Sequence, residues 1–277
     1  MLYEKLSKAF IKIYYKFPIF RPFLDNVAKI YFVLKPRFSG WGMTSGHELP
    51  WNDEYQGQIF RKTCTDVKYH REYTNGKIVD PKAIDKQMWR FWIISYATRY
   101  AIEFSHEEKY NFVECGVGNG FSTFFTLREI AGNKKIENKF SMHLYDAWDA
   151  MKKETLFENE SIRVGAYDNL SIDITKKNLD EFKSNLIYHV GYIPDSFQKQ
   201  DEKIDSIIYL HIDLNSAKST LNTLEFFFPK LTKGGVIVFD DYGQIEYNET
   251  KKIIDKYFSD KPGILMKLPT SQAIFYR

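Results

Sequence analysis

The chain has 277 residues, of which 44% are apolar and 17% aromatic, so it is long enough and apolar enough to bury a large core. Its two cysteines exclude a disulfide framework and favour a reducing, cytoplasmic compartment. The formal net charge is only +3, no apolar run reaches about 18 residues, and the first residues lack a secretory pattern, so we expect neither a membrane-spanning nor an exported protein.

Basic residues are concentrated at the start of the chain. Residues 1–40 hold eight Lys or Arg and two acidic residues, a charge of +6, which leaves −3 for the rest of the +3 total. Apolar residues recur at helical spacing from Leu2 to Phe17 and from Val27 to Leu34, which predicts two short helices. We expect these helices to pack on the protein or to form a homo-oligomer, with peripheral membrane contact as the alternative. Nucleic acid is not an expected partner, because no later segment extends the basic patch.

A longer helix is predicted to begin at Asp80 and Pro81, which suit the capping position and the first turn. Residues 41–52, before it, mix Gly, Pro and aromatic residues without a period. Five apolar or aromatic residues follow the cap at intervals of four and are expected to be core: Ile84, Met88, Trp92, Tyr96 and Tyr100.

After residue 105, short β-type runs alternate with helical patterns, which predicts a parallel sheet with crossover helices. The expected strands are Tyr110 to Cys115, Phe140 to Asp146, Leu186 to Val190, Ile207 to Asp213 and Val236 to Asp241. The expected helices are Phe121 to Ala131, Ile172 to Lys183, Ala217 to Leu231 (stopped by Gly234 and Gly235) and Thr250 to Phe258. The last segment, "ILMKLPTSQAIFYR", predicts a hairpin that closes the sheet. Sheets of this type bind ligands at the carboxyl ends of their strands.

A glycine-rich turn follows the first of these strands. It has the pattern E-x-G-x-G-x-G, in which the acid is Glu114 and the glycines are Gly116, Gly118 and Gly120. Glycine costs roughly 0.5 to 1 kcal/mol in regular structure, so this density indicates a tight bend or close approach of a ligand to the backbone. A dinucleotide fingerprint would need a glycine at Phe121, which disfavours an NAD-dependent oxidoreductase. The spacing resembles motif I of class I S-adenosylmethionine (SAM) methyltransferases; a turn without a ligand is the alternative.

Two further side chains extend this candidate cofactor site. Asp146 ends the second strand, where a carboxylate can accept hydrogen bonds from both hydroxyls of an adenosyl ribose, unless it is simply a surface residue. Ser122 lies in the first turn of the following helix and either binds the cofactor carboxylate or caps the helix. We therefore predict cofactor contacts by Glu114, the three glycines, Ser122 and Asp146.

A second acidic cluster is expected at the same edge of the sheet, beside the candidate cofactor site. Asp213 ends the fourth strand, and Asp240 and Asp241 end the fifth. If these strands are neighbours, about 4.8 Å apart, the three carboxylates converge, and such crowding needs a cation. Oxygen ligands suit Mg²⁺ or another divalent cation better than zinc. We predict that all three ligate the metal and that Asp213 is also the catalytic base; alternatively, Asp213 pairs with a lysine and one of the other two caps a loop.

Five segments carry a family resemblance: "FVECGVGNGFST", "LYDAWDAM", "GYIPDSF", "LHIDLNSAKSTLNTLEFFFPKLTKGGVIVFDDYG" and "LPTSQAI". Together they resemble the TylF-type macrocin O-methyltransferases, over roughly residues 105–277. The resemblance implies a Rossmann-like class I SAM methyltransferase with a mostly parallel seven-stranded sheet and a terminal antiparallel hairpin. It also implies Mg²⁺ held by the three aspartates, and methylation of a sugar hydroxyl of a glycan or secondary metabolite. The "GMTSG" segment around Thr44 resembles the family's lid, so residues 1–104 are expected to form a helical and lid region before the SAM-binding domain of residues 105–277.

One departure from the family affects the acceptor. Family members often continue the fourth strand as D-x-D-x-Y, whereas this chain, which begins the pattern at Asp213, has Asn215 in place of the second acid and Ala217 in place of the tyrosine. A changed acceptor pocket is the expected consequence. The alternatives are a phenolic or catechol-like acceptor, and a non-catalytic adenosyl-binding scaffold.

Overall fold

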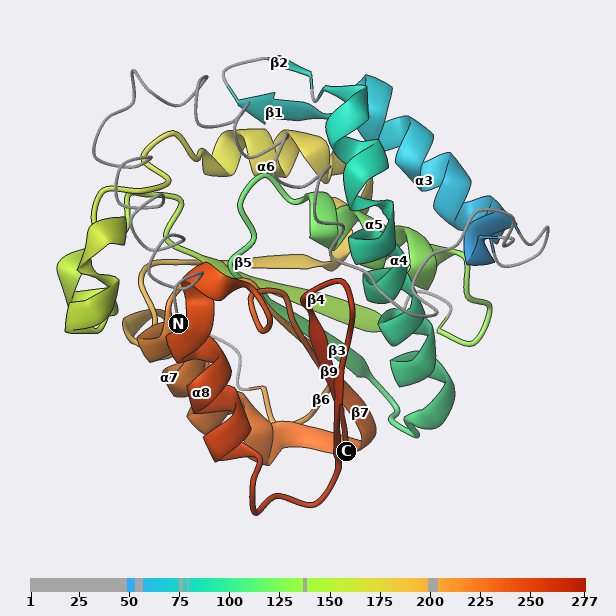
Figure 1. The fold of residues 1–277 in the computed structure, drawn as a ribbon. Coiled ribbons are helices and arrows are strands. Elements are labelled where there is room, and N and C mark those ends of the chain that lie inside the picture. The colour runs from blue at the N-terminus through green and yellow to red at the C-terminus, as the bar shows by residue number, and fades with distance from the viewer. Residues whose placement is uncertain (1–48, 53–56, 75–76, 79, 137–138, 199–203) are drawn as a thin grey trace.

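The structure is a computed structural model that describes residues 49–277, apart from residues 53–56, 75–76, 79, 137–138 and 199–203. Its centre is a seven-stranded sheet of order β5-β4-β3-β6-β7-β9-β8 (Figure 1). The strands are β3 (Tyr110–Cys115), β4 (Phe140–Asp146), β5 (Leu186–Val190), β6 (Ile207–Ile212), β7 (Leu231–Phe239), β8 (Ile264–Lys267) and β9 (Ala273–Tyr276). The first five are parallel and the hairpin β8-β9 is antiparallel, which confirms the predicted fold class.

Helices cover both faces of this sheet (Figure 1). The helices are α3 (Gly57–His70), α4 (Pro81–Phe104), α5 (Phe121–Ala131), α6 (Ile172–Asn178), α7 (Ala217–Phe227) and α8 (Asn248–Tyr257), and a small hairpin is formed by β1 (Glu72–Thr74) and β2 (Lys77–Ile78). Helices α4 and α5 pack on one face and α7 and α8 on the other. Successive strand residues therefore belong to opposite core layers: Phe112 packs with the first pair of helices and Val113 with the second.

Several boundaries differ from the sequence prediction. The helix expected to end at Leu231 ends at Phe227, because Pro229 has no N–H to continue it, and Gly234 and Gly235 lie inside β7 instead of stopping a helix. The helix expected to reach Lys183 ends at Asn178 and is followed by a 3₁₀ turn over Asp180–Asn185. Strands β6 and β7 end one and two residues early, so the acidic residues lie in the loops beyond them.

Helix α4 begins as predicted. The carboxylate of Asp80 accepts a hydrogen bond from the backbone N–H of Lys82 at 3.0 Å, and Pro81 is the first helical residue. One of the five residues of α4 that were predicted to be core is not: Tyr96 is 47% exposed, whereas Ile84 is buried. At 3.6 residues per turn, a spacing of four advances the side chain about 40° each time, so the stripe leaves the buried face along a long helix.

The N-terminal predictions lie outside the described residues. These are the two basic helices of residues 1–40 and the segment around Thr44. The division of the chain at residue 104 stays a prediction. Helix α4, which lies before that division, packs against β6 and β7 and so shares a core with the sheet. Among the described residues, no helix is long and apolar enough to cross a membrane.

Two neighbouring histidines, of which His143 is buried, give a testable prediction. Nδ1 of His143 on β4 lies 3.1 Å from Nε2 of His189 on β5, and burial, aided by His189, lowers the pKa of His143 to about 3. Below pH 6.5 the unfolded chain binds a proton that the folded chain rejects. The free energy of unfolding should therefore fall as pH decreases from 6.5 towards 3, by up to about 1.4 kcal/mol per unit from this group.

Urea unfolding monitored by circular dichroism between pH 7 and 5 measures this dependence. His143→Leu should flatten the profile, whereas His106→Leu, at an exposed histidine, should leave it unchanged. An identical pH slope in the parent and in His143→Leu would contradict the prediction.

Candidate active site at the carboxyl edge of the sheet

A cavity of about 540 Å³ lies at the carboxyl ends of the parallel strands. The chain runs from β3 outward to β5 and then returns to place β6 on the other side of β3, so the strand order reverses between β3 and β6. Such a switch point is where open α/β sheets bind ligands. Gly116 borders the cavity after β3 and Asp213 after β6. Asp146, the last residue of β4, and Gly191, directly after β5, also line it.

The three glycines of the turn all have positive φ, at 87°, 54° and 82°, but they differ in what surrounds them. A Cβ atom on Gly116 would lie 1.9 Å from the carbonyl oxygen of Asp213, and one on Gly120 would lie 3.1 Å from the side chain of Leu179. On Gly118 the nearest atom, of Leu170, would be 4.0 Å away. Internal packing therefore requires the first and third glycines, whereas the middle one leaves space on the cavity side.

Asp146 holds this turn in place from the neighbouring strand. One carboxylate oxygen accepts hydrogen bonds from the N–H groups of Val117 and Gly118 at 2.8 and 2.9 Å, and the other accepts from Trp148 at 2.8 Å. Burial raises the pKa of Asp146, and these backbone hydrogen bonds oppose the rise. The carboxylate lines the cavity, as a ribose ligand must, and it also fixes the shape of the turn.

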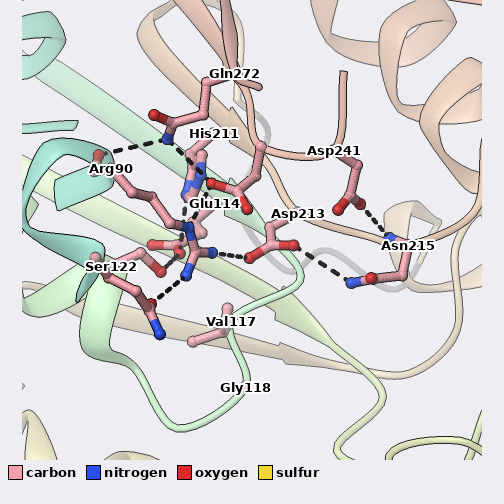
Figure 2. Close-up of polar contacts among 12 residues, drawn as sticks. Arg90, Glu114, Val117, Gly118, Ser122, His211, Asp213, Asn215, Asp241 and Gln272 are labelled. Carbon is pink, nitrogen blue, oxygen red and sulfur yellow. Dashed lines mark hydrogen bonds and ion pairs between the residues drawn. The ribbon is translucent and has the colours of Figure 1, made fainter. Parts of the chain in front are cut away.

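Glu114 points away from the cavity into the protein and does not line it (Figure 2). Its fully buried carboxylate accepts hydrogen bonds from the hydroxyls of Ser122 and Thr123, and it lies 3.1 Å from Nδ1 of His211. Burial lowers the pKa of His211, but Glu114, together with the charges of Asp240 and Asp213, outweighs burial, and the net pKa is raised. Glu114 is thus placed to anchor α5 rather than to touch a ligand.

Ser122 lines the cavity. Because its hydroxyl donates to Glu114, the oxygen offers the cavity an acceptor. This geometry suits an ammonium group better than the carboxylate considered from the sequence.

The three predicted metal ligands come together in space. One carboxylate oxygen from each of Asp213, Asp240 and Asp241 lies within 4.8 Å of the others. Burial and the charge of Asp240 raise the pKa of Asp213 to about 6, and burial with both neighbouring carboxylates raises that of Asp241 well above its usual value. Crowding of this kind is the electrostatic environment in which a divalent cation is favourable.

An arginine that the sequence did not reveal contacts this cluster (Figure 2). Arg90 on α4 donates from Nη2 to Asp213 at 2.6 Å and from Nε to Asp240 at 2.7 Å. Burial raises the pKa of Asp240, but the ion pair with Arg90, together with His211 and the hydrogen bond from Gln272, outweighs burial and lowers the pKa below its ordinary value. Asp213 therefore has a cationic partner, as the alternative interpretation expected, but the partner is an arginine and not a lysine. Asp241 accepts a hydrogen bond from the backbone N–H of Asn215 at 2.8 Å.

Other residues that line the cavity were given no functional role in the sequence analysis, although some of them belong to the segments that carry the family resemblance. After β5, Gly191, Tyr192 and Ile193 line the wall next to Asp146. The start of α4 and the segment between β4 and α6 also line the cavity, with Asp80, Gln87, Met151, Tyr167 and Leu170.

Two aromatic residues near the strand ends have structural contacts. The indole N–H of Trp148 donates to the carbonyl of Gly118 and the hydroxyl of Thr175, and Tyr242 is buried and donates to Asp255.

Comparisons with known proteins agree with this geometry. Residues 113–242 match the family model Methyltransf_24, described as a methyltransferase domain. The O-methyltransferase NovP superposes with a TM-score of 0.62 at 16% identity, over 80% of this chain and 98% of that one. The calicheamicin methyltransferase CalS11 superposes with a TM-score of 0.55 at 14% identity, over 86% and 98% of the two chains. No curated protein sequence matches significantly.

The matched segment runs from within β3 to three residues beyond β7 and contains both the glycine turn and the acidic cluster. The superpositions, at low sequence identity, establish the fold. Taken together, the domain, the fold and the cavity at the strand switch point identify this chain as an enzyme, a SAM-dependent methyltransferase with the class I fold.

Proposed function

We propose that the enzyme is an O-methyltransferase that uses a divalent cation, Mg²⁺ in the first instance, and methylates a sugar hydroxyl of a glycan or secondary metabolite. The observation that carries this proposal is the contact between the two halves of the site. The turn at Gly116 packs directly against the backbone of Asp213, so a donor on the turn and an acceptor at the carboxylates would share one cavity. The resemblance to TylF-type enzymes supports a sugar acceptor, as does the name of one structural neighbour, the TDP-rhamnose 3'-O-methyltransferase CalS11. The name of the O-methyltransferase NovP supports methylation of an oxygen.

The cofactor half of the cavity fits SAM in three parts. The open space beside Gly118 and the acceptor oxygen of Ser122 suit the amino-acid part, next to the N-terminus of α5. Asp146 suits the ribose, and the residues after β5, including Ile193, suit the adenine ring. In this arrangement Glu114 does not contact the cofactor but orients Ser122 by accepting a hydrogen bond from its hydroxyl.

The carboxylate cluster fits a hard divalent cation. Its donors are all oxygens, they belong to three side chains from two adjacent strand ends, and no described His or Cys joins them. Bound there, such an ion would lower the pKa of an acceptor hydroxyl and fix its direction. Asp213, with a pKa of about 6, is ionised at neutral pH and can take the hydroxyl proton. Holding donor and acceptor in one cavity supplies the orientation that an in-line methyl transfer needs.

The acceptor half differs from the family pattern at Asn215. This residue has a φ of 53°, and its backbone N–H binds Asp241 while its carbonyl accepts from Arg163 at 2.9 Å. Its amide, 3.3 Å from Asp213, stands where the family has a second acid, and so removes one negative charge beside the cluster.

On sequence grounds alone, we also propose that the enzyme is a homo-oligomer in the cytoplasm, held together by its N-terminal helices.

Methyl transfer from labelled SAM to a panel of nucleotide sugars, glycans and catechols tests the proposal. We expect a labelled sugar, located by mass spectrometry, with transfer lost in EDTA and restored by Mg²⁺. Transfer to catechols alone would replace the sugar assignment, and transfer unaffected by EDTA would remove the metal. SAM binding without transfer to any acceptor class would favour the non-catalytic scaffold.

A further inference from the structure

Each carboxylate of the acidic cluster uses one of its two oxygens to bind the protein. Oδ2 of Asp213 and Oδ1 of Asp240 accept from Arg90, and Oδ2 of Asp241 accepts from the backbone of Asn215. Among the described residues, no donor contacts the second carboxylate oxygen of Asp240 or of Asp241. The second oxygen of Asp213, Oδ1, has only the 3.3 Å contact with the side-chain amide of Asn215. Three oxygens, one per carboxylate, thus remain available for a ligand.

Arg90 is itself held in a fixed orientation. Its third nitrogen, Nη1, donates to Gln87 one turn earlier on α4 at 3.1 Å. Gln272, from the loop before β9, donates to Asp240 at 3.0 Å and to the carbonyl of Arg90 at 3.4 Å. The next helical residue, Phe91, is buried and stacks on Phe125 with ring centroids 4.4 Å apart. The guanidinium therefore joins two strand ends to a helix whose backbone cannot easily shift.

We propose that Arg90 is the positioning residue of the metal site: its planar fork fixes Asp213 and Asp240 with their remaining oxygens free for the cation. This inference rests on the proposed metal-assisted function. A guanidinium can bind two carboxylates at once with defined geometry, whereas an ammonium acts as a single point charge. The permanent positive charge also offsets part of the repulsion among three crowded carboxylates.

Binding of Mn²⁺ to the full-length protein with SAM present, measured by calorimetry and by electron paramagnetic resonance, tests the role without relying on turnover. Partners that orient metal ligands typically contribute 10- to 100-fold in affinity, so Arg90→Met should weaken Mn²⁺ binding by at least about 10-fold. Arg90→Lys should weaken it less, because charge is kept and the fork is lost. SAM affinity measured without metal should stay within about threefold of the parent, since Arg90 contacts the carboxylates and not the glycine turn.

Arg99→Met provides a matched control on the same helix. Arg99 forms a 2.9 Å ion pair with Glu129 and lies over the ring of Trp92, away from the cluster. Its loss removes a comparable, largely buried ion pair and should leave Mn²⁺ affinity within about threefold of the parent.

The outcomes separate the two proposals. If Arg90→Met binds Mn²⁺ as tightly as the parent or more tightly, Arg90 is a competitor or a bystander and the inference is overturned, whereas the metal site stands. If the parent binds no Mn²⁺, the metal assignment and the inference fall together. Should Arg90→Met not fold, Arg90→Lys decides alone, and parental affinity in that variant overturns the positioning role.

Discussion

Asp213→Asn is expected to reduce methyl transfer by about 10³-fold or more while SAM still binds within about threefold of the parent affinity. The substitution keeps the size of the side chain but removes the charge that a metal ion and an acceptor proton both require. A positioned base alone contributes about 10²- to 10⁴-fold, and weaker metal binding adds to the loss. Initial rates with labelled SAM and calorimetric SAM binding measure the two effects separately.

A carboxylate elsewhere in the same cavity supplies the control for Asp213. Asp80→Asn should retain nearly full activity, because Asn caps helices as well as Asp does and Asp80 lies outside the cluster. Equal losses in both variants would indicate a general change in cavity charge. Unimpaired turnover in Asp213→Asn would refute its catalytic role.

Gly116→Ala is expected to remove SAM binding and to destabilise the fold. Its φ of 87° costs a side-chain-bearing residue on the order of 1–3 kcal/mol, and the new Cβ would lie 1.9 Å from the carbonyl oxygen of Asp213. Either the turn or the β6 strand end must then move. Because the turn and the carboxylate cluster meet at this point, one methyl group should disrupt both halves of the site. Urea unfolding and SAM calorimetry measure the two losses.

Gly165→Ala separates backbone strain from the steric clash. Gly165 has a nearly identical φ of 83°, but a Cβ there meets no atom within 4 Å. This variant should show only the strain cost and keep its SAM affinity. If Gly116→Ala behaves like Gly165→Ala, the proposed contact between the turn and the end of β6 does not control the site.

Local patterns predicted the sheet well because they depend on neighbours in the chain. Strands β3, β4 and β5 have the predicted bounds, since short apolar runs flanked by polar or glycine residues read as strands without knowledge of the fold. The later boundaries shifted where one local signal competed with another, as at Pro229, which ended α7 before Gly234. The prediction that every fourth residue of α4 is core failed at Tyr96 for a geometric reason. A helix has 3.6 residues per turn, so residues four apart rotate progressively around its axis.

The sequence by itself determined which residues stand at the carboxyl ends of the strands: the glycine turn, Asp146 and the three aspartates. A parallel sheet with crossover helices gathers such ends at one edge, so a candidate site could be named from strand order alone. Only the tertiary structure decided how these side chains are used. It turned Glu114 inward to hold Ser122, and it brought Arg90 across 123 positions of sequence to Asp213. Such contacts depend on how α4 packs over the sheet, and that packing is set by the whole core and not by any local pattern.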